Sequence, residues 1–474
     1  MPSDVIRSPV ELTFDRGTLL LRGLPSRDGW TFDARVGCLR THAIHYAAER
    51  RDLLRDVHVR LFDRVRVPPR VAWPRLELPR LHAAQTQALD AWERGNGRGV
   101  IVMPTGTGKT EVALAAMARA RVATLVVAPV RDLMHQWHRR ILRGLGCDAG
   151  IVGDSIFNPQ PVTVTTYDSA YARMPELGDR FGLVIFDEAH HLPGRCYREA
   201  AMFCAAPMRL GLTATPDRAD GRHVDLDALI GPIVYRQEIA EARGGALADY
   251  EVVRVPVNLS DAEQQTYDGA SDTIRTFIIR RQQELREQTA PGFKPPAYTW
   301  QDLCAESGAD PGARLAQKAF HLRKSIEDRA ADKLRVLEDL FRLHAGERVI
   351  VFAGSNAMAI DVSRRFLVPT LLSHSRKRER REVLERFADG RFPVLVANQV
   401  LDEGVDVPAA KVAVVIGGLA STRQAKQRLG RILRRSGDAR ATLYEIVCQG
   451  TGDEERSRKR RRSDAYDRVK RRRM

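Results

Sequence analysis

One glycine-rich segment has the residue types needed to bind phosphate. MPTGTGKT (103–110) follows the apolar run GVIV and precedes EVALAAMARA, a stretch of helical composition. A glycine-rich turn between a strand and a helix directs backbone N–H groups and a helix N-terminus at a phosphate. Lys109 would reach the terminal phosphates of ATP and Thr110 would bind Mg²⁺, although Met103 stands where the strict pattern has glycine. The residues expected to line the turn are Thr105, Gly106, Thr107 and Gly108.

A pair of adjacent acids forms the second candidate group, in GLVIFDEAHHL (182–192). Four apolar residues lead directly into Asp187 and Glu188, so we expect a buried strand that ends in two carboxylates. Ligands of open α/β sheets lie outside the carboxyl ends of the strands. Asp187 fits the acid that holds Mg²⁺ in phosphate-loop enzymes, and Glu188 fits the general base that orients the attacking water. His190 is expected to link this site to a second α/β unit.

Positive charge for the γ-phosphate is expected from QRLGRILRR (427–435). Gln427 opens this segment, and Arg431 and Arg434 lie three residues apart on one face of a predicted helix. An arginine finger contributes roughly 10³ to 10⁵ in rate. Since the segment belongs to the second α/β unit, we expect the site to be completed when the two units close on ATP.

The charge of the chain favours a nucleic-acid partner. Its 474 residues have a formal net charge of +16, and 43% of them are hydrophobic, enough for several cores. Residues 456–474 contain 11 Lys and Arg and two Asp, a net charge of +9, and form either a phosphate-binding tail or a solvated end. No apolar stretch reaches the ~20 residues of a membrane span, and the first residues lack the order of a signal peptide. Six scattered cysteines without a CxxC pair indicate a reducing compartment, so we predict a cytoplasmic, nucleoid-associated protein.

Apolar strands alternate with helical segments in two parts of the chain. This alternation predicts an α/β fold with two parallel-sheet domains, a small N-terminal α+β domain and an inserted helical module. Near the start, Gly17 stands where a three-residue hairpin requires a left-handed residue. The predicted parts are an N-terminal domain (1–70), the ATP-binding domain (75–250), the helical insert (258–325), the second α/β domain (326–455) and a basic tail (456–474).

Several short motifs together resemble a superfamily 2 helicase. They are TGTGKT, DEAHH, LTATP (212–216), DEGVDVP (402–408) and QRLGR. Across nearly the whole chain, their order is similar to that of the archaeal and bacterial XPB-type helicases, relatives of the xeroderma pigmentosum group B subunit. DRGTLLLRG near the start is similar to that family's damage-recognition domain, and the helical insert stands in the place of its thumb module.

The resemblance implies two RecA-like domains and ATP-dependent translocation on DNA in the 3′-to-5′ direction, with duplex opening and a role in DNA repair. Thr213 and Thr215 would couple hydrolysis to the DNA strand. Gln85 would read adenine, although the aromatic residue that usually precedes it is Ala84 here. Arg218 and Asp220 stand in the place of an Arg-Glu-Asp motif implicated in strand separation, with alanine at its centre. The residues that the resemblance assigns to the ATPase site are Lys109, Thr110, Asp187, Glu188, Gln427, Arg431 and Arg434.

The expected partner is DNA, both single-stranded and as a duplex or fork. The resemblance places the strand path along segments that begin at Pro129, Thr165, Phe352 and Ser373. In the last of these, SHSRKRERRE, the basic residues Arg376, Lys377 and Arg378 suit phosphate contacts or a solvated helix face. We expect a monomer or a hetero-complex. The alternatives are a duplex translocase without processive unwinding, the motor subunit of a complex with a separate nuclease, an RNA helicase, and a non-enzymatic nucleic-acid-binding module.

Overall fold

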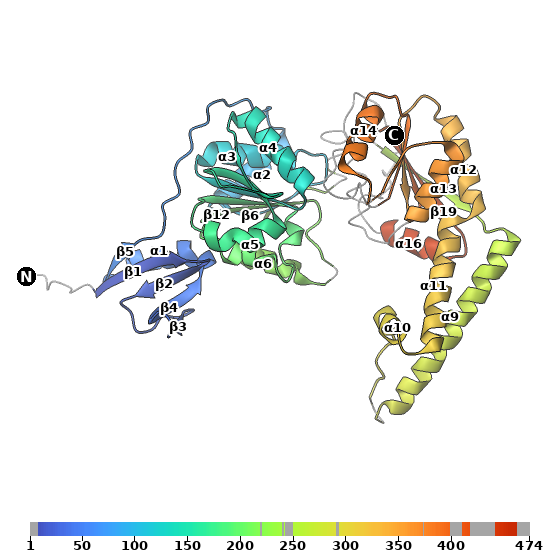
Figure 1. Cartoon of the computed structure of the whole chain (residues 1–474), viewed down its shortest axis with the longest axis horizontal. Helices are drawn as coiled ribbons and strands as arrows, with labels where there is room; N and C mark the ends of the chain where they lie inside the picture. The colour runs from blue at the N-terminus through green and yellow to red at the C-terminus, as the bar shows by residue number, and fades with distance from the viewer. Residues whose placement is uncertain are drawn as a thin grey trace, which may run out of the picture. The chain divides into compact units, whose positions relative to one another are not determined.

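The computed structural model describes residues 8–218, 220–238, 241, 250–290, 293–372, 374–398, 410–417 and 441–461. The chain divides into two compact units, residues 1–247 and 248–474, and each is described by itself (Figure 1). Both units contain a parallel β-sheet, so the predicted α/β fold class is confirmed. Among the described residues, no helix is both long and apolar enough to cross a membrane.

The first unit begins with a five-stranded sheet in the order β3-β4-β2-β1-β5. Its first two strands form an antiparallel hairpin in which Asp15 pairs with Thr18. The connecting loop therefore has two residues, Arg16 and Gly17, both left-handed, and the prediction of a three-residue loop was wrong. Left-handed residues at both positions match the twist of the flanking strands. The elements are β1 (Ser8–Asp15), β2 (Thr18–Arg22), β3 (Thr31–Asp33), β4 (Cys38–His42), α1 (Tyr46–Arg55) and β5 (Val59–Asp63).

This small sheet packs against the large sheet domain of the same unit through Phe203. The ring of Phe203 stacks on His42, with 5.9 Å between the ring centroids. A Cβ atom at Gly17 would lie 2.6 Å from the Phe203 side chain, so a larger residue at the hairpin turn would clash there. The hairpin loop thus also serves as a packing surface.

The large sheet of the first unit has the order β13-β6-β12-β11-β7-β10-β8-β9, with a parallel core. The five strands predicted from buried apolar runs are confirmed: β6 (Arg98–Val102), β7 (Thr124–Ala128), β10 (Val162–Thr166), β11 (Leu183–Asp187) and β12 (Met208–Thr213). The edge strands were not predicted: β8 (Gly150–Gly153), β9 (Ile156–Asn158) and β13 (Ile233–Arg236).

Helices cover both faces of this sheet, and each face has its own apolar core. One core contains residues of α2 (Ala83–Arg94), α3 (Lys109–Ala120) and α4 (Arg131–Leu145). The other contains residues of α5 (Tyr167–Leu177), α6 (Arg198–Met202) and α7 (Asp225–Leu229). With both faces buried, the strands can be apolar throughout, which explains why their sequences show continuous rather than alternating apolar runs.

The second unit contains a six-stranded parallel sheet in the order β14-β19-β18-β15-β17-β16. Four of its strands are those predicted: β15 (Val349–Ala353), β17 (Val394–Ala397), β18 (Val412–Ile416) and β19 (Ala441–Cys448). β14 (Tyr250–Val257) and β16 (Thr370–Leu371) were not predicted. The helices around this sheet include α12 (Ala331–Leu343), α13 (Asn356–Phe366), α14 (Lys377–Ala388) and α16 (Gly452–Arg461).

A helical hairpin extends from this second sheet domain (Figure 1). Its two long helices, α9 (Asp261–Gln288) and α11 (Pro311–Arg329), lie side by side, and α10 (Trp300–Glu306) packs on α11. Ser260 caps α9 through a reciprocal pair of hydrogen bonds with Glu263, which satisfies backbone donors at the helix start. These helices account for the charged helical composition between the two strand-rich parts of the sequence.

Candidate active site

The predicted phosphate loop lies between β6 and α3. Gly106 and Gly108 have φ angles of +89° and +81°, in the left-handed region that glycine adopts without strain. A Cβ atom at Gly108 would clash with Nε2 of Gln85, so a larger residue there would have to displace this side chain. Lys109 is the first residue of α3, and its ammonium donates to the backbone oxygens of Met103 at 3.1 Å and Pro104 at 3.3 Å. The loop therefore brings a cation and a helix N-terminus together.

The chemistry of this loop fits a triphosphate. The hydroxyl oxygen of Thr105 is buried and makes no hydrogen bond to the described part of the chain. Thr107 is held by a 2.7 Å hydrogen bond that its hydroxyl donates to Pro104 O. The N-terminus of α3, the Lys109 ammonium and the glycine turn together offer positive potential to an anion. For a hard divalent cation, the Thr110 hydroxyl and the Asp187 carboxylate are suitable oxygen ligands.

Asp187 is the last residue of β11 and is almost fully buried. Its Oδ2 accepts a 2.8 Å hydrogen bond from Nε1 of Trp137, and its Oδ1 accepts one of 3.0 Å from the backbone N–H of Glu188. Burial raises the pKa of Asp187, an effect that the Trp137 hydrogen bond and the charge of Lys109 oppose. Lys109 therefore favours the ionised form of Asp187, which is the form that binds a cation.

Glu188 has a φ angle of +47°, an uncommon backbone conformation for a residue with a side chain. Such residues are concentrated at functional sites, where the surrounding structure maintains the strain. The preceding backbone oxygen, of Asp187, accepts a 3.0 Å hydrogen bond from the hydroxyl of Tyr167. The left-handed turn directs the two adjacent carboxylates differently, which suits two separate roles.

His190 connects the acids to the LTATP segment. Its Nδ1 lies 3.0 Å from Oγ1 of Thr213 and 3.4 Å from Oε2 of Glu188. The Thr213 hydroxyl also accepts a hydrogen bond of 3.2 Å from the backbone N–H of Thr215. These contacts connect Thr213 and Thr215 to Glu188 through His190.

The Arg218–Asp220 pair lies next to this group. The guanidinium of Arg218 makes two hydrogen bonds to the Asp220 carboxylate, of 2.9 and 2.7 Å, and a third of 2.6 Å to His190 O. The hydrogen bonds from Arg218 hold the pKa of Asp220 well below the usual range. Arg218 therefore connects the segment similar to the strand-separation motif with His190, while Ala219 lies outside the described residues.

Gln85 faces the phosphate loop. It is 5% exposed, and its Nε2 donates to Thr107 O at 2.9 Å while its Oε1 accepts from the backbone N–H of His82 at 2.8 Å. In this structure the side chain thus supports the loop backbone. Gln85 was expected to read adenine, and that role stays a prediction.

The remaining predicted site residues belong to the second unit of the chain. Gln427, Arg431, Arg434 and the DEGVDVP segment are outside the described residues. In the second unit, Arg376 is the N-cap residue of α14, Lys377 begins that helix, and Arg376 and Arg378 are exposed. The exposed side chains leave both a phosphate-binding role and a solvated face open.

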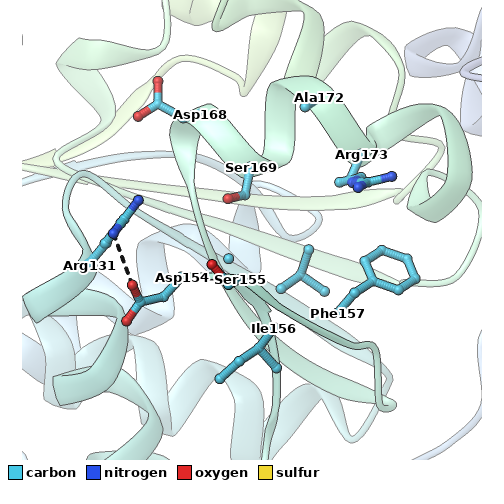
Figure 2. A pocket seen from close by; sticks show the side chains of 11 residues that line it. Arg131, Asp154, Ser155, Ile156, Phe157, Asp168, Ser169, Ala172 and Arg173 are labelled. Carbon is cyan, nitrogen blue, oxygen red and sulfur yellow. Dashed lines mark hydrogen bonds and ion pairs between the residues drawn. The ribbon is translucent and has the colours of Figure 1, made fainter.

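A cavity of about 360 Å³ lies beside the carboxyl ends of β7 and β10 (Figure 2). One wall is the β8–β9 hairpin, whose Asp154 makes a 3.0 Å ion pair with Arg131 from the start of α4. His135 lies 3.1 Å from the same carboxylate. On the opposite side, the Arg173 guanidinium lies over the ring of Phe157, 5.3 Å from its centroid. The segments from Pro129 and from Thr165, predicted to follow a DNA strand, both contribute to this cavity.

The contacts that two residues make with Asp187 were not predicted from the sequence. Trp137 and Tyr167 both donate hydrogen bonds to Asp187, from 50 and 20 positions away in the chain. A signal for the first existed, because Met134, Trp137 and Ile141 share one apolar helix face. A buried indole N–H usually has an acceptor. The identity of that acceptor could not be read from the sequence.

Three protein families match parts of the chain. The family described as Type III restriction enzyme, res subunit, matches residues 78–218, and the Helicase conserved C-terminal domain matches residues 332–436. The Xeroderma pigmentosum group B helicase damage recognition domain matches residues 12–65. These matches follow the order in which the sequence motifs occur.

Two named proteins and one solved structure are similar to this chain. The DNA 3'-5' translocase XPB2 of Sulfurisphaera tokodaii is 43% identical over 377 residues, which cover 80% of this chain and 83% of that protein. The DNA 3'-5' helicase XPB of Kineococcus radiotolerans is 31% identical, over 81% of this chain and 62% of that protein. The helicase domain of Pyrococcus furiosus Hef has the same fold, with a TM-score of 0.53 and 19% identity over 81% of this chain and 98% of that one. The chain belongs to the XPB family of superfamily 2 DNA helicases.

Proposed function

We propose that this chain couples ATP hydrolysis in its first unit to 3′-to-5′ movement on DNA, with duplex opening, in DNA repair. As a member of the XPB family it is an ATP-dependent DNA helicase or translocase. The observation that carries the proposal is the chain of contacts from the acids of β11 through His190 to Thr213. These contacts connect residues suited to hydrolysis with a segment suited to sensing the DNA strand.

We propose the following roles for the nucleotide-site residues. Lys109 and the backbone of Thr105–Gly108 hold the terminal phosphates, and Glu188 accepts a proton from the attacking water. Thr110 and Asp187 hold Mg²⁺, which supplies charge neutralisation at the phosphates when bound. Gln85 supports the loop and reads adenine. Arg431 and Arg434 are proposed to act on the γ-phosphate as arginine fingers, with Gln427 as a further residue of the ATPase site.

The cavity beside α4 is proposed as part of the DNA path. Arg131 and the hydroxyl of Ser169 offer donors to a backbone phosphate (Figure 2). Phe157 lines the same cavity beside Arg173 and is 48% exposed, which offers a surface on which a base can stack. In the second domain, phosphate contacts are assigned to Arg376, Lys377 and Arg378. Strand separation is assigned to Arg218 and Asp220 of the first unit.

A second candidate function is duplex translocation without processive unwinding, as the motor beside a separate nuclease. The relative from Sulfurisphaera tokodaii carries the name translocase and is 43% identical to this chain. The alanine in the Arg218–Asp220 segment also favours this candidate, since the family motif has glutamate there. Both candidates share the ATPase site and differ in what the movement does to the duplex.

A strand-displacement assay on 3′-tailed and 5′-tailed duplexes of DNA and RNA, with ATP turnover measured in parallel, tests the proposal. Displacement of the 3′-tailed DNA substrate with DNA-stimulated turnover supports the helicase. Stimulated turnover without displacement supports the translocase instead. Turnover that neither nucleic acid stimulates would contradict both.

A further inference from the structure

Trp137 lies two turns into α4 and is buried, with 2% of its side chain exposed. Its indole makes one described hydrogen bond, in which Nε1 donates to Oδ2 of Asp187 at 2.8 Å. The two residues come from different elements, since Asp187 ends β11. The indole N–H thus donates its hydrogen bond to the acid that the proposed function assigns as a Mg²⁺ ligand.

We propose that Trp137 is a positioning residue for ATP hydrolysis, which orients the Asp187 carboxylate toward Mg²⁺. The inference rests on the proposed role of Asp187. The indole holds one carboxylate oxygen while the Glu188 N–H holds the other, so rotation about the side-chain bonds is restricted. Each carboxylate oxygen has two lone pairs, so both can still bind a cation or its water.

An orienting partner of this kind has a measurable effect. Residues that hydrogen-bond to a metal ligand fix its direction, and their replacement typically lowers metal affinity about 10- to 100-fold. Trp137 also lies on the helix that begins with Arg131, the residue that lines the proposed DNA cavity. A single helix therefore contacts both the acid and the cavity.

The first unit offers a matched control in Trp92. This indole is also 2% exposed, and its Nε1 donates to a backbone oxygen, that of Arg209, at 3.0 Å. Trp92 is on α2 and has no described contact with either acid. Replacing either tryptophan by phenylalanine removes one buried indole and one hydrogen bond, so a general loss of packing should affect both variants alike.

The test is a binding titration with the full chain and a fluorescent non-hydrolysable ATP analogue. Analogue affinity is measured in EDTA, and Mg²⁺ is then titrated to obtain its apparent affinity. Trp137→Phe should lower the Mg²⁺ affinity about 10- to 100-fold and leave the affinity in EDTA unchanged. Trp92→Phe should change neither. An unchanged Mg²⁺ affinity in Trp137→Phe, or equal losses in the two variants, would overturn the inference.

Two further variants keep the test decisive. Benzothienylalanine at position 137 keeps the shape of the indole without its N–H, and should reproduce the loss even where Trp137→Phe folds poorly. Asp187→Asn separates the inference from the proposed function. If it loses Mg²⁺ affinity while both position-137 variants keep it, only the positioning role fails. If it keeps Mg²⁺ affinity, the proposed role of Asp187 fails as well.

Discussion

Nδ1 of His190 lies 3.0 Å from the hydroxyl oxygen of Thr213, and both side chains are buried. His190 follows the acids of β11 closely in sequence, whereas Thr213 ends the neighbouring strand, β12. A shift at the acids can therefore reach the LTATP segment through one side-chain contact. This pair connects the acids at the end of β11 with the segment that is proposed to sense the DNA strand.

Thr213→Val should uncouple turnover from movement. The substitution keeps the shape of the side chain but removes the hydroxyl that contacts His190 and Thr215, while leaving the acids in place. We expect ATP turnover to persist and strand displacement to fall about tenfold or more, since loss of one buried hydrogen bond costs about 1–3 kcal/mol. Thr124→Val is the control, because its buried hydroxyl bonds to Val122 O at the opposite end of the sheet. An equal fall of both activities would contradict the coupling role.

Arg131→Gln should weaken DNA binding in a salt-dependent way. Each phosphate contact to a single strand contributes about 0.7 to the slope of log affinity against log salt, so the variant should lose about that much. Arg143→Gln is the matched control, since Arg143 is exposed in the last turn of the same helix. Fluorescence anisotropy at several salt concentrations measures both slopes. Equal slopes for wild type and Arg131→Gln would remove this residue from the DNA path.

Lys333 and Asp453 form an ion pair in which neither side chain is exposed, with Nζ 2.7 Å from Oδ2. Lys333→Met would remove the nearest cation from the buried Asp453 carboxylate, whose Oδ1 also lies 3.6 Å from Arg456, and loss of one partner from a buried ion pair typically costs about 3–5 kcal/mol. Hydrogen exchange at the β19 amides measures the free energy of opening in this unit. Arg342→Met, which breaks an exposed pair with Glu338, should cost about 1 kcal/mol or less. If the two variants lowered the free energy of opening by similar amounts, the claim that the buried pair stabilises this unit more than the exposed pair would be contradicted.

The basic tail should be tested by removing residues 462–474, which contain six Lys and Arg and two Asp. Truncation nearer to Thr451 would also remove α16, whose Asp453 pairs with Lys333 and whose Ser457 bonds to Glu445. If the tail binds duplex phosphates, the shorter chain should lose about 0.9 of salt slope per contact, with folding intact. An unchanged slope would identify the tail as a solvated end.

The strands and the site residues within them could be predicted from the sequence, because both leave strong local signals. Buried parallel strands are continuous apolar runs, as in Leu183–Phe186, and their carboxyl ends are followed by the acids and threonines of the site. The β8–β9 hairpin gave no such signal, since its strands are short and Ile156 and Phe157 are exposed. In a sequence, two adjacent apolar residues such as these do not show whether they lie in a buried strand or on the surface.

Contacts between distant residues could not be predicted. Trp137 and Asp187 are 50 positions apart, and their hydrogen bond depends on how α4 packs on the sheet. The same is true of Gln85, whose amide supports a loop 22 positions away. The hairpin at Gly17 was predicted with the right residue but the wrong loop length, because a glycine at this position suits both loop types. Residue types reveal chemistry, whereas partners require the packed structure.

The most direct test of the account is DNA-stimulated ATP turnover in Glu188→Gln. The substitution keeps the size and position of the side chain but removes the base, so turnover should fall about 10²- to 10⁴-fold while binding of the ATP analogue is retained. Lys109→Ala should lose both turnover and binding, with the fold intact. Normal DNA-stimulated turnover in Glu188→Gln would contradict the proposal that the acids at the end of β11 hydrolyse ATP to drive this motor.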